Sequence, residues 1–183
     1  MNNKNTLAIV FALFFILTTV NVITDNKAPR QQEPSIYNID INDLTIINIS
    51  STNEKIAWLA SFAACDKHLS NKTKEARNAC ALDLVAIAHQ ENRDFSHNTR
   101  GSDSFQSHGL FQISRYYHKH VTIDQANDPY FSADWTLARL INNGYLTSNR
   151  DNSIMRHNGT PNIPATIRYL AGINNYILLI NNN

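Results

Sequence analysis

The chain has 183 residues, of which 43% are hydrophobic and 17% charged, and its formal net charge at pH 7 is +1. This composition excludes an intrinsically disordered chain and a strongly basic nucleic-acid-binding protein. Lysine and arginine form no run interleaved with aromatic residues, so we expect no nucleic-acid partner.

The N-terminal segment 1–23 contains a continuous apolar run over residues 7–17. Extended to Ile23, the run suits a signal peptide and is about the minimum length for a transmembrane helix. No Ala-x-Ala cleavage site follows it, because Ala28 comes only after two charged residues. The pattern therefore predicts an exported protein and favours a retained membrane anchor, with a cleaved signal peptide as the alternative.

Residues 24–50 differ in composition from the segments on either side. The first part is polar and contains Pro29 and Pro34, which is typical of a linker. From Ile36 onward, isoleucine alternates irregularly with asparagine and aspartate. We interpret this part as weakly ordered, extended chain that docks on the following domain, and a true strand of that domain is the alternative.

Two helices are predicted at the start of the domain. Ser51-Thr-Asn-Glu54 fits a capping box and opens an apolar pattern, which comprises Ile56, Leu59, Ala60, Ala63 and Ala64, and which we expect to end near His68. Thr73 suits the cap of a second helix that runs to Glu91. A polar turn joins the two helices, so they are expected to form an antiparallel hairpin.

The two cysteines of the chain lie on these predicted helices. Cys65 and Cys80 are placed symmetrically about the turn residues Lys72 and Thr73, so they come opposite each other in an antiparallel hairpin. A disulfide between them is expected in an exported protein. Two buried thiols remain the alternative, and the spacing fits no zinc motif.

Two more helices are predicted in the second half of the chain. Asp128 and Pro129 suit the N-cap and first position of a helix, and Gly144 suits its C-terminal end. A last helix is predicted from Ile163 and Pro164. The expected apolar stripes comprise Tyr130, Ala133, Leu137, Leu140 and Ile141 in the first helix, and Ile167, Leu170, Ile173 and Ile177 in the last.

No alternating strand pairs and no internal repeat are visible in the sequence. We therefore predict a mainly α domain over residues 51–183, in which residues 92–107 form the longest irregular segment.

Glu91 is the first candidate for chemistry. Ile87, Leu84 and Cys80 precede it by four, seven and eleven residues, so the acid shares the core-facing stripe of its helix. Partial burial disfavours the charged carboxylate and raises its pKa, as a proton donor near neutral pH requires. The structural alternative is a glutamate that reaches water or pairs with Arg93.

Further along the chain, three features follow Glu91 in a fixed order. These are the segment Gly109-Leu-Phe-Gln112-Ile, a helix opened by Asp128-Pro129, and the segment Arg156-His-Asn158-Gly-Thr-Pro before the last helix. Over about residues 51–178 this order resembles the soluble lytic transglycosylase type of domain, within the lysozyme-like superfamily. The resemblance implies a lysozyme-like helical fold and cleavage of the MurNAc–GlcNAc β-1,4 bond of peptidoglycan.

The sequence departs from that family's pattern at three places. Asn92 follows the glutamate where the family usually has serine, and Phe111 replaces a methionine. His157-Asn158 stands where the family has a Tyr-Asn pair. These departures affect the expected contacts to sugar more than the catalytic acid. Beside the acid, Asn92 can still offer a hydrogen bond in place of the family's serine.

The resemblance also implies roles for these residues. Glu91 would protonate the leaving oxygen and then accept the proton of the substrate's own C6 hydroxyl, which closes a 1,6-anhydro ring. Gln112 and Asn158 would bind sugar N-acetyl groups, and Asn92 and His157 would add substrate contacts. A tyrosine of the last helix would support the reacting sugar; by the family's layout it is Tyr169. An ordinary core role for Tyr169 or Tyr176 remains the alternative.

A second resemblance concerns the loop after Glu91. Arg100-Gly-Ser-Asp103, shortly before Gly109, together with Arg115-Tyr-Tyr117-His118 after Gln112, is similar to goose-type lysozymes. In those lysozymes an aspartate at the place of Asp103 positions the attacking water. A second goose-type aspartate would fall on Ser114 and is absent. Asp103 would then be the base of an inverting hydrolysis, with Asp94 behind it as a candidate. A plain turn residue after Gly101 is the structural alternative for Asp103.

No metal or other cofactor is expected, because the histidine spacings match no zinc helix motif. The expected partners are peptidoglycan strands and a membrane reached through the N-terminal helix. A secretion or conjugation machine is a further expected partner for an enzyme of this kind in the cell envelope. A glycan-binding relative that kept the fold without turnover is the remaining function class.

Overall fold

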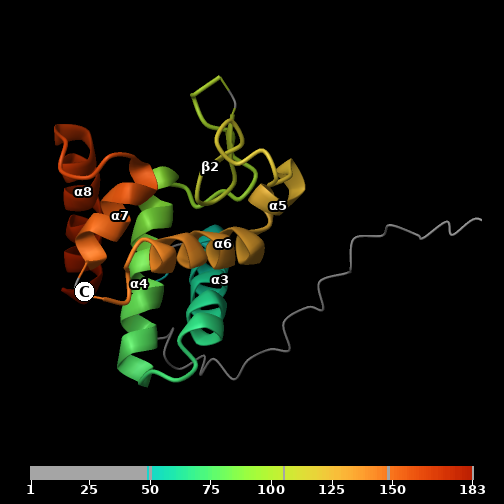
Figure 1. Ribbon diagram of the computed structural model, residues 1–183. Helices are drawn as coiled ribbons and strands as arrows, with labels where there is room; N and C mark the ends of the chain where they lie inside the picture. Colours follow the sequence, from blue (N-terminus) through green and yellow to red (C-terminus); the bar gives the residue numbers. More distant parts are fainter. Residues whose placement is uncertain (1–48, 50, 105, 148, 183) are drawn as a thin grey trace, which may run out of the picture. The chain divides into compact units, whose positions relative to one another are not determined.

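The computed structural model describes residues 49, 51–104, 106–147 and 149–182, and within them the fold is mainly α-helical (Figure 1). The helices are α3 (Thr52–His68), α4 (Lys74–Glu91), α5 (Ile123–Asn127), α6 (Pro129–Asn142), α7 (Arg150–Asn158) and α8 (Pro164–Asn181). The strands are β1 (Ser107–His108) and β2 (Ile113–Ser114).

The predicted N-terminal segment 1–23 lies outside the described residues. The same holds for the predicted linker 24–50, apart from Ile49, whose side chain packs against the core. None of the helices in the described ranges combines the length and apolar character that crossing a membrane requires.

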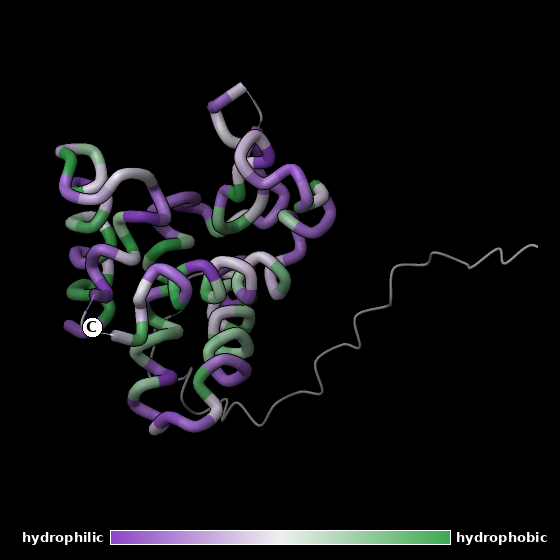
Figure 2. The backbone as a smooth tube through the Cα atoms, viewed as in Figure 1, coloured by the Kyte–Doolittle hydropathy of each residue, from purple (hydrophilic) through white to green (hydrophobic). Residues whose placement is uncertain are grey.

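Helices α3 and α4 form the predicted antiparallel hairpin. Ser51 Oγ accepts a hydrogen bond from the Glu54 backbone N–H at 3.1 Å, and Thr73 Oγ1 accepts one from Ala76 at 3.3 Å, so both predicted caps are confirmed. Hydrophilic residues line the turn between the helices (Figure 2). The predicted disulfide is also confirmed, because Cys65 and Cys80 are bonded across the hairpin.

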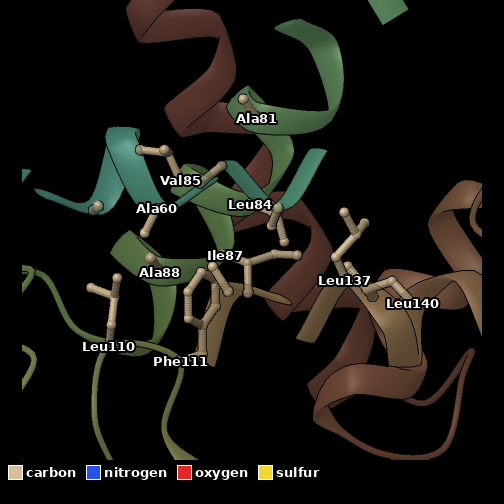
Figure 3. Packing of buried hydrophobic residues seen from close by; sticks show 14 of the residues in the cluster. Ala60, Ala81, Leu84, Val85, Ile87, Ala88, Leu110, Phe111, Leu137 and Leu140 are labelled. Carbon is tan, nitrogen blue, oxygen red and sulfur yellow. The ribbon is translucent and has the colours of Figure 1, made fainter. Parts of the chain in front are cut away.

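The core is built around the second half of α4. That part of the helix is buried on most sides, because α3 and α8 both pack along it, and α6 packs against α3. Figure 3 shows Leu84 and Ile87 of α4 facing Leu137 of α6, with Phe111 of the irregular segment beside them. The C-terminal end of α4, with Glu91, therefore emerges directly from the buried core.

The predicted start of α6 is confirmed. Asp128 Oδ1 accepts hydrogen bonds from the backbone N–H groups of Tyr130 at 2.8 Å and Phe131 at 3.0 Å. Gly144 follows the C-cap with a φ of +95°, as a residue that ends a helix in the left-handed conformation should.

Helix α8 begins at the predicted proline, but its predicted stripe is wrong in part. Ile167 is 51% exposed. Leu170 and Ile177 are only partly buried, while Ile173 is fully buried. The buried face consists of Thr166, Tyr169, Ile173 and Tyr176.

The segment between α4 and α6 contains more order than predicted. Strands β1 and β2 pair antiparallel, with Ser107 opposite Ser114, and α5 follows. Gly109 lies in the turn between the strands with a φ of +79°, and an added Cβ would approach the Ala126 carbonyl oxygen to 1.8 Å. Only glycine fits there, so this residue fixes the turn that carries Gln112.

Candidate active site

Glu91 is the last residue of α4, and its side chain is 17% exposed. Burial raises the pKa of its carboxyl group to about 7. Its place at the negative end of the helix dipole acts in the same direction. The predicted partly buried acid is therefore present, and near neutral pH a substantial fraction of it carries a proton.

Tyr169 of α8 is the direct partner of this acid. Its hydroxyl donates a hydrogen bond to Glu91 Oε1 at 2.6 Å, which opposes the effect of burial by stabilising the carboxylate. Burial and the neighbouring Glu91 together raise the pKa of Tyr169 well above its ordinary value. The phenol therefore stays protonated and remains a donor over the whole physiological pH range. Of the two tyrosines considered from the sequence, Tyr176 contacts a different acid, with its hydroxyl 3.2 Å from Glu54 Oε1.

His157, near the end of α7, lies on another side of Glu91. Its Nε2 is 3.7 Å from Glu91 Oε1, which is too long for a hydrogen bond. Burial lowers the pKa of His157 to about 4, and the charges of Arg139 and His118 act in the same direction. The imidazole is therefore neutral at pH 7 and brings no positive charge that would ionise Glu91.

A cleft of about 490 Å³ opens beside Glu91. The end of α4, the 99–118 segment, α6 and α7 all contribute to its lining. The lining brings together five of the residues predicted from the sequence, namely Glu91, Asp103, Gln112, His157 and Asn158. A cleft of this size can hold a small ligand, and Glu91 is among the residues that line it.

Asp103 lies on the lining as an exposed residue. Its two carboxylate oxygens accept hydrogen bonds from Ser107 Oγ at 2.6 Å and from the Ser107 backbone N–H at 3.0 Å. These bonds hold the pKa of Asp103 below its usual range, so it is ionised at neutral pH. Asp103 thus closes a turn and also presents a charged carboxylate to the cleft, whereas Asp94 is not among the lining residues.

Gln112 is held in one orientation by the chain around it. Its Nε2 donates to the Gly109 carbonyl oxygen at 2.7 Å, and its backbone has a φ of +46°. A Cβ on Gly101 would lie 2.7 Å from Gln112 Oε1. Gly101 thus allows the loop to approach the Gln112 side chain closely, which helps to hold the amide at the cleft.

Two of the predicted substrate contacts, Asn92 and Tyr169, are not among the residues that line the cleft, although Tyr169 bonds to Glu91. Asn92 caps the C-terminal end of α4, and its backbone N–H bonds to the Ala88 carbonyl oxygen at 2.8 Å. Its buried side chain donates to the Ser96 carbonyl oxygen. The backbone of Asn92 therefore closes the helix end, and its side-chain amide is bonded within the following loop.

Two lining residues, Trp135 and Arg139 of α6, were not singled out from the sequence. They are four residues apart in a predicted helix and therefore lie on the same face, a pattern that could have identified them as a pair. Tyr117 and His118, from the segment Arg115-Tyr-Tyr117-His118 considered in the sequence, also form part of the wall. Within the described ranges, no three histidine, cysteine, aspartate or glutamate side chains are grouped so that they could hold a metal ion.

Comparisons of the chain with protein-family models, with curated proteins and with solved structures find no match.

Proposed function

We propose that this protein cleaves the glycan strands of peptidoglycan at the MurNAc–GlcNAc β-1,4 bond, with Glu91 as the general acid. We further propose a lytic transglycosylase reaction in a lysozyme-like domain, as the sequence resemblance implies. The observation that carries the proposal is the carboxyl group of Glu91, whose pKa is raised to about 7 beside a cleft of sugar-binding size. A protonated acid at neutral pH is what departure of a glycosidic oxygen requires.

The transglycosylase route uses Glu91 twice. The carboxyl proton first moves to the glycosidic oxygen as the bond between this oxygen and C1 of the muramyl sugar breaks. The resulting carboxylate then takes the proton of the C6 hydroxyl, and the C6 oxygen bonds to C1 to close the 1,6-anhydro ring. Glu91 ends the cycle protonated, and no second carboxylate and no water are consumed.

Tyr169 supports this cycle because Glu91 must hold a proton in one step and a charge in the next. The phenol donates to Oε1, so it stabilises the transient carboxylate without removing the proton from the resting acid. The neutral His157 imidazole leaves the pKa of Glu91 high.

A goose-type-like lysozyme reaction is the second candidate, and the ionised Asp103 on the cleft lining favours it. In an inverting hydrolysis this carboxylate would activate a water molecule on the opposite face of the sugar from Glu91. Such enzymes separate their two carboxyl groups by roughly 6.5 to 9.5 Å to admit that water.

The first test is Glu91→Gln on purified full-length protein with isolated peptidoglycan as the substrate. Release of soluble muropeptides is expected to fall by about 10²- to 10⁴-fold, which is the contribution of general acid catalysis. The matched control is Glu75→Gln at the exposed start of the same helix, which should leave the rate unchanged. Unchanged release by the Glu91 variant would rule out the proposed mechanism, and a wild type that binds strands without cutting them would identify a glycan-binding protein.

Mass spectrometry of the products separates the two reactions. Anhydro-muropeptides that survive Asp103→Asn support transglycosylation. Reducing ends that disappear in both the Glu91→Gln and the Asp103→Asn variants support hydrolysis by inversion.

We propose a cell-envelope location for this activity, either membrane-anchored or free in the periplasm or outside the cell. The disulfide between Cys65 and Cys80 supports an oxidising compartment. Local opening of the wall for a secretion or conjugation machine is the cellular role we propose for a tethered enzyme of this kind.

A further inference from the structure

Arg139 of α6 is a half-buried cation in the wall of the cleft that contains Glu91. Among the described residues, no carboxylate forms an ion pair with it. The nearby Asp134 pairs instead with Lys67 and His68. A partly buried guanidinium group without a counterion is costly unless a ligand supplies the negative charge.

Two neighbours hold this guanidinium group in place. Its central carbon lies 4.9 Å from the centre of the Trp135 ring, and Nη1 is 3.3 Å from His118 Nδ1. Arginine can only donate, so His118 Nδ1 is the acceptor and the neutral imidazole carries its proton on Nε2. Burial and the Arg139 charge lower the pKa of His118, which keeps the imidazole neutral. Both contacts fix the guanidinium group without neutralising it.

The two acids that line the cleft, Asp103 and Glu91, have other hydrogen-bond partners and do not pair with Arg139. Asp103 accepts from Ser107 with both oxygens, and Glu91 is bonded to Tyr169 and is only partly ionised near neutral pH. The remaining N–H groups of Arg139 have no partner among the described residues. A planar guanidinium group with unused N–H donors can donate two parallel hydrogen bonds to the two oxygens of a carboxylate.

We propose that Arg139, held by Trp135 and His118, is a carboxylate-binding subsite that recognises a negatively charged group on the muramyl unit of the strand. This inference rests on the proposed function and names the specificity of the same cleft. Two groups of peptidoglycan offer this chemistry: the lactyl carboxylate of a peptide-free strand, and the carboxylates of a stem peptide. Arg139 thereby makes the enzyme prefer charged muramyl strands over neutral ones.

The test compares matched pairs of substrates. One pair is a peptide-free muramyl oligosaccharide with its lactyl groups either as free acids or as amides. The other pair carries stem peptides with carboxylates either free or amidated. The quantity measured is the ratio of kcat/KM for the charged and neutral member of each pair. This ratio does not depend on the fraction of folded protein, so a variant that folds poorly still gives an interpretable result.

For the full-length wild type we expect a ratio of about 10 or more for one of the pairs, as a charge-assisted hydrogen bond supplies. That pair identifies the source of the carboxylate. Arg139→Gln should bring the ratio close to 1. Arg139→Lys should keep part of the preference, because lysine keeps the positive charge but cannot donate two parallel hydrogen bonds. The control Arg168→Gln, at an exposed position of α8 outside the cleft lining, should keep the wild-type ratio.

A wild-type ratio near 1 for both pairs would overturn the subsite, and so would an Arg139→Gln variant that keeps the wild-type ratio. The same oligosaccharides are also used in calorimetric binding measurements, where the ratio of Kd values replaces that of kcat/KM. A wild type that cuts none of them but discriminates in binding through Arg139 would retain the subsite and refute only the enzymatic function.

Discussion

Glu91 and Tyr169 are separated by 78 residues in sequence but share a hydrogen bond of 2.6 Å. The stripe of apolar residues before Glu91 was enough to predict the buried acid. The choice between Tyr169 and Tyr176 could not be made from periodicity, because two turns of helix separate them and both lie on the buried face of α8. Only the packing of α8 along α4 decides that Tyr169 meets Glu91 while Tyr176 meets Glu54.

Tyr169→Phe tests how the pKa of Glu91 is set. The phenol stabilises the charged carboxylate, so its removal should raise the pKa of Glu91 above about 7. A general acid works in its protonated form, and therefore the alkaline limb of the kcat/KM profile should move to higher pH. The control is Tyr176→Phe, because the Tyr176 hydroxyl bonds to Glu54 and not to Glu91. This variant should leave the pH of the alkaline limb unchanged. A limb that moves to lower pH in Tyr169→Phe would contradict this assignment.

At the level of single elements, α7 positions His157 and Asn158 at the cleft, yet nothing in the sequence predicted it as a helix. It spans Arg150–Asn158, has no side-chain hydrogen bond that caps a backbone N–H at its N-terminal end, and buries only Ser153, Ile154 and Met155. A short helix without a cap or an apolar stripe is set by tertiary contacts, which local patterns do not report. The exposure of Ile167 has a related cause, because α8 is apolar on several faces and its period is ambiguous.

One of the tertiary contacts that position α7 is an ion pair between α7 and α4. Arg150 Nε donates to Asp83 Oδ2 at 2.8 Å, and its Nη2 donates to Asp83 Oδ1. The Tyr145 hydroxyl also donates to Oδ2, at 2.6 Å. Asp83 is buried, so these donors supply the hydrogen bonds that its carboxylate oxygens would otherwise make with water.

Arg150→Met should therefore lower the free energy of unfolding by about 3 kcal/mol, because it leaves a buried carboxylate with one donor. The double variant Asp83→Leu/Arg150→Met should lose less than the single one, since no buried charge remains. Urea denaturation of both variants measures the difference. If the double variant is less stable than Arg150→Met, the ion pair does not have the structural role assigned to it.

For the whole molecule, Glu91 and His157 make opposite contributions to the pH dependence of stability. The unfolded Glu91 ionises from a pKa of 4.5 and the folded one only near 7, so its contribution is full below pH 4.5 and is lost as the pH rises to about 7. The unfolded His157 takes up a proton below 6.5 and the folded one only near 4, so stability is lost there as the pH falls. In the wild type the two effects largely cancel between these limits.

Glu91→Gln removes the contribution of Glu91 to this pH dependence and leaves that of His157. Relative to wild type, the variant should gain about 3 kcal/mol in free energy of unfolding between pH 4.5 and pH 8, at about 1.36 kcal/mol per pKa unit. Urea denaturation at the two pH values gives this difference. The Glu75→Gln control should show no such gain, because hydrogen bonds lower the pKa of that exposed carboxyl. Equal curves for wild type and Glu91→Gln would mean that burial does not perturb Glu91.

The protonated state of Glu91 underlies the proposed reaction, the response to Tyr169→Phe and the pH dependence of stability. It can be measured directly by following the side-chain carboxyl carbon of Glu91 through a pH titration by NMR, with the Glu91→Gln variant used to assign the signal. The account predicts a midpoint close to pH 7. A midpoint at the ordinary glutamate value of about 4.5 would contradict it.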